Sequence, residues 1–242
     1  MYNFRKYAKS DKPYKYLTLS FDDGVTQDRR FLEIINRYGL KCTFNLNSGT
    51  LGMPGELHGK DWRVDHIKVA PEEVRDLYEG HEIAVHTVHH PRLDLLSQDE
   101  VFHEVEDDRI ALEELSGQKI IGMAYPGGHY FNDDVINTIR TGTPIVYSRD
   151  VFSTYDFSLP ENLMIWKPTV HMNDEKLFDI SKRFIEEDFD EDTLLYVWGH
   201  TYEFDIYDSW DKVERFCEYI SGRDDVTYAT NGEIAEYILN NK

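Results

Sequence analysis

Residues 16–24 read YLTLSFDDG, a short apolar stretch that ends in two adjacent aspartates and a glycine. The apolar run Tyr16–Phe21 predicts a buried strand. Adjacent side chains on an extended segment point in opposite directions, and two neighbouring carboxylates raise each other's pKa. The pair Asp22 and Asp23 therefore indicates either a solvated strand end or a site that needs both carboxylates.

Short apolar runs alternate with helical patterns along almost the whole chain, which predicts an α/β fold with a parallel sheet and crossover helices. A barrel of seven or eight βα units fits this order better than an open sheet. We expect strands at Tyr16–Phe21, Cys42–Leu46, Glu82–His86, Ile120–Ala124, Ile145–Arg149, Leu163–Lys167, Leu194–Trp198 and Val226–Tyr228. We expect helices at Asp28–Tyr38, Pro71–Tyr78, Gln98–Leu115, Asn132–Thr141, Asp174–Glu186, Trp210–Ile220 and Gly232–Leu239.

Local signals support some of these boundaries. Ser97 with Glu100, and Thr230 with Glu233, fit the capping box at a helix start. The segment Asn47–Val69 contains four glycines and two histidines and predicts a long loop over one end of the sheet.

The composition excludes several classes of partner. The 242 residues carry 46 acidic and 26 basic side chains, a formal charge of -20, which disfavours binding to nucleic acid or to an anionic membrane. No leader-like apolar segment and no run of about 20 apolar residues is visible, so we expect a cytoplasmic protein. Cys42 and Cys217 lack a CxxC spacing and are expected to be buried free thiols.

A second cluster of polar residues lies in HEIAVHTVHHPRL, residues 81–93. His86 and His90 are four residues apart around one turn, and Pro91 follows them. Two histidines and a carboxylate form a common ligand set for a catalytic zinc, and either aspartate of the pair could complete it. The aspartate that does not bind could then take a proton from the attacking water. The alternative is that these histidines belong only to a polar loop.

Two further segments follow predicted strands. In LLYVWGHTYEFD, residues 194–205, His200 could protonate a leaving group, or it could simply pack among the neighbouring aromatic rings. In AYPGG, residues 124–128, the glycines would let backbone N–H groups approach an oxyanion, but the same residues also make ordinary turns.

Taken together, the motifs resemble those of the polysaccharide deacetylases, carbohydrate esterase family four. The family motif T-F-D-D-G is matched by residues 20–24, H-[ST]-x-x-H-P is matched by residues 86–91, and the resemblance spans roughly residues 17–205. It implies a distorted (β/α) barrel and metal-dependent removal of an acyl group, usually acetyl from an N-acetylated sugar. It also implies Asp22 as general base, Asp23, His86 and His90 as metal ligands, and His200 as general acid.

The third family motif, R-P-P-Y-G, is only partly present. Ala124 stands where the family has the arginine that orients the base, and Gly127 stands where it has tyrosine. The Gly127 N–H could still stabilise an oxyanion, and Tyr125 could contact the substrate. Arg149 ends the next predicted strand and could replace the missing arginine.

The fourth family motif, which supports the acid histidine, is not recognisable. Trp166, with His171 nearby, could form an aromatic wall of a sugar site or could belong to the core. The acid that supports His200 stays unassigned.

We therefore expect residues 1–242 to form a single catalytic domain, with a core of about residues 16–240 and about seven parallel strands. The expected cofactor is a divalent metal, zinc first, with Co²⁺, Ni²⁺ or Mn²⁺ as alternatives. The expected substrate is an acetylated carbohydrate or a small amide. The rival hypotheses are a non-sugar amidase and a carbohydrate-binding homologue with impaired catalysis, and the oligomeric state is left open.

Overall fold

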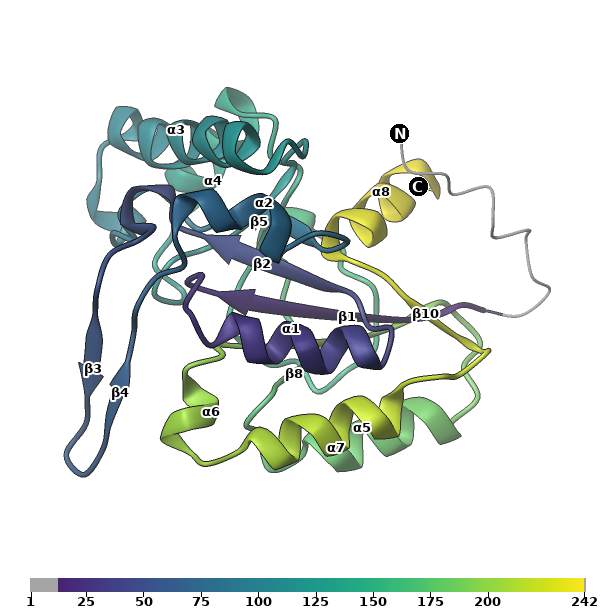
Figure 1. Cartoon of the computed structure of the whole chain (residues 1–242). Helices are drawn as coiled ribbons and strands as arrows, with labels where there is room; N and C mark the ends of the chain where they lie inside the picture. The colour runs from purple at the N-terminus through teal and green to yellow at the C-terminus, as the bar shows by residue number, and fades with distance from the viewer. Residues whose placement is uncertain (1–12, 242) are drawn as a thin grey trace.

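The computed structural model describes residues 13–241. Its main feature is one curled sheet with the strand order β7-β6-β5-β2-β1-β9-β8, to which β10 adds beside β1 (Figure 1). The strands are β1 (Lys15–Asp22), β2 (Cys42–Leu46), β5 (Glu82–Val85), β6 (Gly122–Ala124), β7 (Tyr147–Arg149), β8 (Val170–His171), β9 (Thr193–Gly199) and β10 (Val226–Tyr228). All pairings within this sheet are parallel in the described part of the chain. The predicted distorted (β/α) barrel is thus confirmed.

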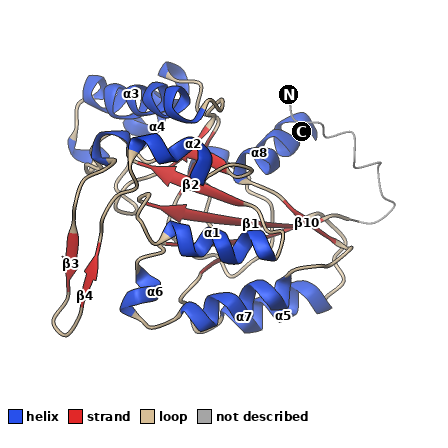
Figure 2. Ribbon diagram, viewed as in Figure 1, coloured by secondary structure: helices blue, strands red, loops and turns tan. Residues whose placement is uncertain are grey.

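Helices cover the outer face of the sheet (Figure 2). They are α1 (Asp28–Arg37), α2 (Val74–Leu77), α3 (Gln98–Ser116), α4 (Asp133–Gly142), α5 (Leu177–Glu186), α6 (Glu203–Ile206), α7 (Trp210–Ile220) and α8 (Asn231–Asn241). In β9 every residue is buried, as expected for a parallel strand covered on both faces. No helix of residues 13–241 combines the length and the apolar character needed to cross a membrane.

Both predicted capping boxes are present. Ser97 Oγ accepts from Glu100 N at 3.3 Å, and the Glu100 carboxylate accepts from Ser97 N at 2.8 Å. The same pair of bonds joins Thr230 and Glu233, at 3.3 and 2.8 Å. These bonds satisfy backbone donors that a helix start leaves free, and so they fix where α3 and α8 begin.

Two predicted elements were wrong. The segment Leu163–Lys167 is not a strand: it forms a 3-10 turn at Leu163–Ile165, and the chain enters the sheet only at β8. A single bridge between Arg149 and Trp166 is what remains of the predicted strand. The loop predicted at Asn47–Val69 contains a hairpin of β3 (Glu56–His58) and β4 (Arg63–Asp65), which projects from the body of the protein (Figure 1).

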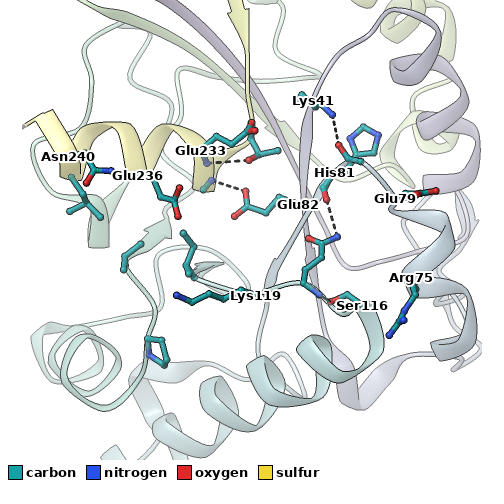
Figure 3. Close-up of a pocket in the computed structure, with 18 of the residues that line it drawn as sticks. Lys41, Arg75, Glu79, His81, Glu82, Ser116, Lys119, Glu233, Glu236 and Asn240 are labelled. Carbon is teal, nitrogen blue, oxygen red and sulfur yellow. Dashed lines mark hydrogen bonds between the residues drawn. The ribbon is translucent and has the colours of Figure 1, made fainter. Parts of the chain in front are cut away.

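The amino ends of the strands are closed by α8. Figure 3 shows Glu82, at the start of β5, directed toward the first turn of α8, where Gly232 N donates to Glu82 Oε2 at 2.8 Å. A cleft of about 1890 Å³ lies at this end, and its walls carry charges of both signs. Cys42 and Cys217 are buried free thiols, as predicted.

Candidate active site

The polar residues singled out in the sequence gather at the opposite, carboxyl ends of the strands. Asp22 ends β1, His86 follows β5, Arg149 ends β7 and His200 follows β9. In parallel α/β folds this edge of the sheet is where the connecting loops build the site. Asp23 has a left-handed backbone with a φ of 81°, so the chain turns sharply between the two aspartates.

Asp22 is buried and is held on both carboxylate oxygens. Its Oδ1 accepts from Asn45 Nδ2 at 2.8 Å, and its Oδ2 accepts from Arg149 Nη2. The same Oδ2 lies 3.9 Å from His86 Nε2 and 3.8 Å from His200 Nε2. Burial alone would raise the pKa of Asp22, but the positive neighbours, Arg149 foremost, outweigh burial and lower it. Asp22 is therefore a carboxylate at neutral pH, the form that a general base needs.

Arg149 reaches Asp22 from the far edge of the sheet. It is fully buried, its guanidinium lies 4.4 Å from the centre of the Trp198 ring, and its Nη1 donates to the Asp150 carbonyl at 3.3 Å. Ala124, at the position of the family arginine, is paired with Arg149 in the register of β6 and β7. The structure thus places a guanidinium on Asp22 from the strand beside the expected one.

Asp23, His86 and His90 converge on one point. Asp23 Oδ1 lies 4.0 Å from His86 Nε2 and 3.8 Å from His90 Nε2, and the three ligand atoms lie within 4.8 Å of one another. The loop is held by Asn47 Nδ2, which donates to the His86 carbonyl at 2.5 Å and to the Thr87 carbonyl at 2.9 Å.

The position of the ring proton of His86 decides whether this residue can bind a cation. His86 Nδ1 lies 2.9 Å from the Ala124 carbonyl and must donate to it, because a carbonyl can only accept. The unprotonated Nε2 is buried and has no hydrogen-bond partner among the described residues. Burial also lowers the pKa of His86 to about 4, so the ring is neutral. A buried imidazole lone pair that faces a carboxylate and a second histidine fits a divalent metal.

His66 and Lys68 also contact Asp23, and sequence reasoning missed both. His66 Nε2 lies 3.2 Å from Asp23 Oδ2, while Lys68 Nζ donates to the Asp23 carbonyl at 2.7 Å and lies 3.5 Å from Oδ1. Burial would raise the pKa of Asp23, but the hydrogen bond from His66 and the charge of Lys68 hold it well below its usual value. Both residues follow the β3–β4 hairpin, whose return to the site the sequence does not announce.

His200 is held by Glu203, the acid that sequence reasoning left unassigned. His200 Nδ1 lies 3.3 Å from Glu203 Oε1. Burial would lower the pKa of His200, but the hydrogen bond to Glu203 and the charges of Asp22 and Asp23 outweigh it and raise the pKa to about 9. His200 is therefore protonated at neutral pH. His200 and Glu203 are three residues apart in the turn that leads into α6, and this spacing is the sequence feature that could have identified Glu203 as the partner of His200.

The three predicted substrate contacts have different outcomes. Gly127 lies beside the cluster of Asp23, His86 and His90: a Cβ added there would stand 3.8 Å from His90 Cε1, and its φ of 66° favours glycine. Tyr125 is only 1% exposed, and its hydroxyl donates to the Met164 carbonyl at 2.9 Å. Trp166 is also 1% exposed and packs edge-on against buried tyrosines. The core buries both side chains, so for Trp166 the structure favours core packing, the second of its two predicted roles, and for Tyr125 it offers no exposed surface that supports a substrate contact.

Comparison with known families decides the relationship. Residues 9–142, more than half of the chain, match the family model described as polysaccharide deacetylase. The chain belongs to the polysaccharide deacetylase family. A search of curated proteins finds no match.

Solved structures of polysaccharide deacetylases share the fold. The family-four domain of a multidomain xylanase from the hindgut metagenome of Trinervitermes trinervoides matches with a TM-score of 0.58 and 15% identity, over 93% of this chain and 91% of that one. A mutant of peptidoglycan deacetylase PdaC from Bacillus subtilis matches with a TM-score of 0.56 and 18% identity, over 95% and 93%. A family-four pseudoenzyme from Bacillus anthracis matches with a TM-score of 0.53 and 17% identity, over 93% and 66%.

Proposed function

We propose that this chain is a metal-dependent hydrolase that removes an acetyl group from an N- or O-acetylated sugar or oligosaccharide. One observation carries the proposal: Asp22 Oδ2 lies within 4 Å of the Arg149 guanidinium, of a His86 nitrogen and of His200 Nε2. An ionised carboxylate, a candidate metal ligand and a protonated imidazole therefore lie close enough together to serve as base, metal site and acid. Residues 1–242 would act as a single catalytic domain, with its core at about residues 16–240.

Asp23, His86 and His90 would hold the divalent metal, zinc first, with Co²⁺, Ni²⁺ or Mn²⁺ as alternatives. Such a cation polarises an acyl carbonyl and makes water more acidic. His66 and Lys68 would keep Asp23 ionised and oriented for this role.

The side chains around the cluster would move the protons. Asp22 takes a proton from the water that attacks the acyl carbon, and Arg149 and Asn45 keep its carboxylate in place. The backbone N–H of Gly127 stabilises the developing oxyanion, a role that needs no side chain. His200 gives a proton to the leaving nitrogen or oxygen as its bond to the acyl carbon breaks.

The main alternative to this proposal is a carbohydrate-binding homologue without catalysis. One of the structural neighbours is a pseudoenzyme, so the alternative has a precedent in the fold. The retained chemistry favours an enzyme. Arg149 contacts Asp22 from another strand than the family arginine, and the Glu203 carboxylate supports His200 from a position outside the fourth family motif. A binding site for a neutral sugar has no need for either contact. A non-sugar amidase would use the same residues, so only the substrate separates it from the deacetylase.

The test begins with metal analysis of the purified protein and then screens acetate release. The substrates are acetylated chitooligosaccharides, peptidoglycan fragments and simple acetate esters. We expect acetate release by the metal-loaded protein, none by Asp22→Asn although metal stays bound, and loss of both metal and activity in His86→Ala. Absence of acetate release from every acetylated sugar by the metal-loaded protein would refute the proposed function.

A further inference from the structure

His171, at the end of β8, has no part in the mechanism above, yet it contacts the carboxylate that holds His200. His171 Nε2 lies 3.1 Å from Glu203 Oε2, while His200 Nδ1 lies 3.3 Å from Glu203 Oε1. Trp198 packs edge-on against both rings, at centroid distances of 4.7 and 5.7 Å. The two histidines are thus joined through one carboxylate and share one aromatic neighbour.

A backbone contact sets the tautomer of His171. The backbone N–H of Asn173 donates to His171 Nδ1 at 3.1 Å, so this nitrogen carries no proton. The proton of the neutral ring is therefore on Nε2, where it points at Glu203 Oε2. The same oxygen also accepts from Asn173 Nδ2 at 3.3 Å.

These bonds leave the other oxygen of Glu203 for His200. With Oε2 occupied by two donors, Oε1 accepts the Nδ1 proton of His200, and the opposite nitrogen, Nε2, lies 3.8 Å from Asp22 Oδ2. An ionised, fixed Glu203 therefore determines which nitrogen of His200 faces the site. Without His171, one side of Glu203 would lose its strongest donor and the carboxylate could rotate away.

We propose that His171 is a positioning residue that acts through Glu203 to hold His200 with a protonated Nε2 toward the leaving atom, and thereby enables cleavage of amides. The inference rests on the proposed function. In the step concerned, the C–N bond breaks, its electron pair stays on nitrogen, and the proton of His200 Nε2 transfers to that nitrogen. His200 is left neutral, with its remaining proton on Nδ1, where it still donates to Glu203 Oε1. A good leaving group such as nitrophenolate departs without this proton, so aryl esters bypass the step.

A second cation site is the competing explanation, since ligand atoms of His171, His200 and Glu203 lie within 4.8 Å of one another. It would require a lone pair on His171 Nε2 and hence a proton on Nδ1. That proton would face the Asn173 N–H, donor against donor, so the observed contact at 3.1 Å favours the hydrogen-bonded chain.

The cavity beside His171 makes it suitable for substitution. A space of about 480 Å³ is lined by His171, Asn173, Glu203, Tyr207 and Ser209, among others. Glutamine at position 171 can offer a side-chain N–H to Glu203, whereas alanine cannot. Tyr207→Phe is the matched control, because Tyr207 lines the same cavity and makes none of the hydrogen bonds above.

The test compares two substrates on the metal-loaded protein: an acetylated chitooligosaccharide, whose leaving group is an amine, and 4-nitrophenyl acetate. We expect His171→Ala to lower kcat for the amide by about tenfold or more, with little change in KM, because general-acid catalysis contributes roughly 10²–10⁴-fold. Hydrolysis of the aryl ester should change less than about twofold. His171→Gln should recover most of the amide rate, and Tyr207→Phe should match the wild type on both substrates.

Two results would overturn the inference alone: an unchanged amide rate in His171→Ala, or equal losses on amide and ester. A wild-type metal content of two ions per chain, reduced to one by His171→Ala, would overturn it in favour of the second cation site. If the wild type releases acetate from O-acetylated sugars but from no amide, the inference is overturned and the proposed function stands. If it releases acetate from no acetylated sugar, the proposed function fails, and the inference that rests on it fails too.

Discussion

The guanidinium of Arg149 lies against Oδ2 of Asp22, although 127 positions separate the two residues in the chain. The contact joins the last residue of β7 to the last residue of β1, across the inside of the curled sheet. Both side chains are buried, so neither charge is solvated by bulk water. In that setting the removal of one partner leaves the other charge uncompensated.

Arg149→Ala should therefore raise the pKa of Asp22 and move the acidic limb of the pH–rate profile to higher pH. We expect a loss of activity on the order of 100-fold at pH 7, measured as kcat for acetate release. The double variant Arg149→Ala with Ala124→Arg moves the guanidinium to the family position and should restore part of the rate. Arg140→Ala, at an exposed arginine, is the control. An unchanged profile in Arg149→Ala would refute the role of Arg149.

His66→Ala should weaken metal binding, because it removes a hydrogen bond to the second oxygen of Asp23. Loss of an outer partner of a metal ligand typically costs about 10–100-fold in affinity. Titration with a metal chelator measures the effect, and excess metal should restore most of the rate. His58→Ala, at the other histidine of this segment, removes an exposed ring and should leave the affinity as it is. Equal affinities in both variants would contradict the prediction.

The pKa of His200, raised to about 9, predicts the basic limb of the amide reaction. The acid works only while protonated, so kcat should stay level as pH rises through 7 and 8 and should fall above about 9. Glu203→Gln removes the carboxylate charge and so should lower the pKa of His200 and move this limb toward neutral pH. The measurement is the pH profile of kcat for the wild type and for Glu203→Gln. Basic limbs at the same pH in the two proteins would show that Glu203 does not raise the pKa of His200.

Asp28→Asn should stabilise the protein above neutral pH. Asp28 is buried between the hydroxyls of Tyr78 and Thr201, and burial raises its pKa to about 7. The unfolded value is about 3.9, so between these values the folded state binds more protons, and the free energy of unfolding falls as pH rises from about 4 to 7. Asp28→Asn lacks this fall. The difference in free energy of unfolding between the variant and the wild type should therefore be on the order of 3 kcal/mol more favourable to the variant at pH 8 than at pH 4. Urea unfolding at the two pH values tests it.

The matched control for this variant is Asp188→Asn, at an exposed aspartate. It should follow the wild-type pH dependence closely. If Asp28→Asn keeps the wild-type fall in stability between pH 4 and 8, Asp28 does not carry the raised pKa.

The sequence predicted the barrel well because its parallel strands are buried apolar runs separated by helices with their own start signals, as at Ser97 and Thr230. It failed at Leu163–Lys167, where an apolar run pairs with β7 at a single bridge and otherwise forms a 3-10 turn and packs in the core. Trp166, in the same segment, shows a related difficulty. A tryptophan ring suits a protein core as well as a sugar-binding surface, and only its structural neighbours distinguish the two.

For the site, sequence analysis succeeded where a residue belongs to a short motif or ends a predicted strand, and it missed residues that carry neither signal. The placement of Asp22, Asp23, His86 and His90 follows from two short motifs at strand ends. His66 and Lys68 reach Asp23 only because a hairpin returns the chain to β1, through a bridge between Val25 and Lys68. No pattern of spacing encodes that return. Their roles, like those of His200 and Gly127, stay predictions until the variants are measured.

Left-handed backbone conformations are concentrated at the candidate metal site formed by Asp23, His86 and His90. Of the five non-glycine residues with positive φ in the described part of the chain, three are Asp23, Thr87 and His90, at 81°, 71° and 58°. Each such residue costs on the order of 1–3 kcal/mol of strain. In the proposed metal site, the folded chain itself bears this strain when it places the candidate ligands Asp23 and His90. Thr87→Gly would relieve backbone strain, but it would also remove the buried hydroxyl that accepts from His90 N at 3.1 Å, so we expect a more mobile loop and weaker metal binding.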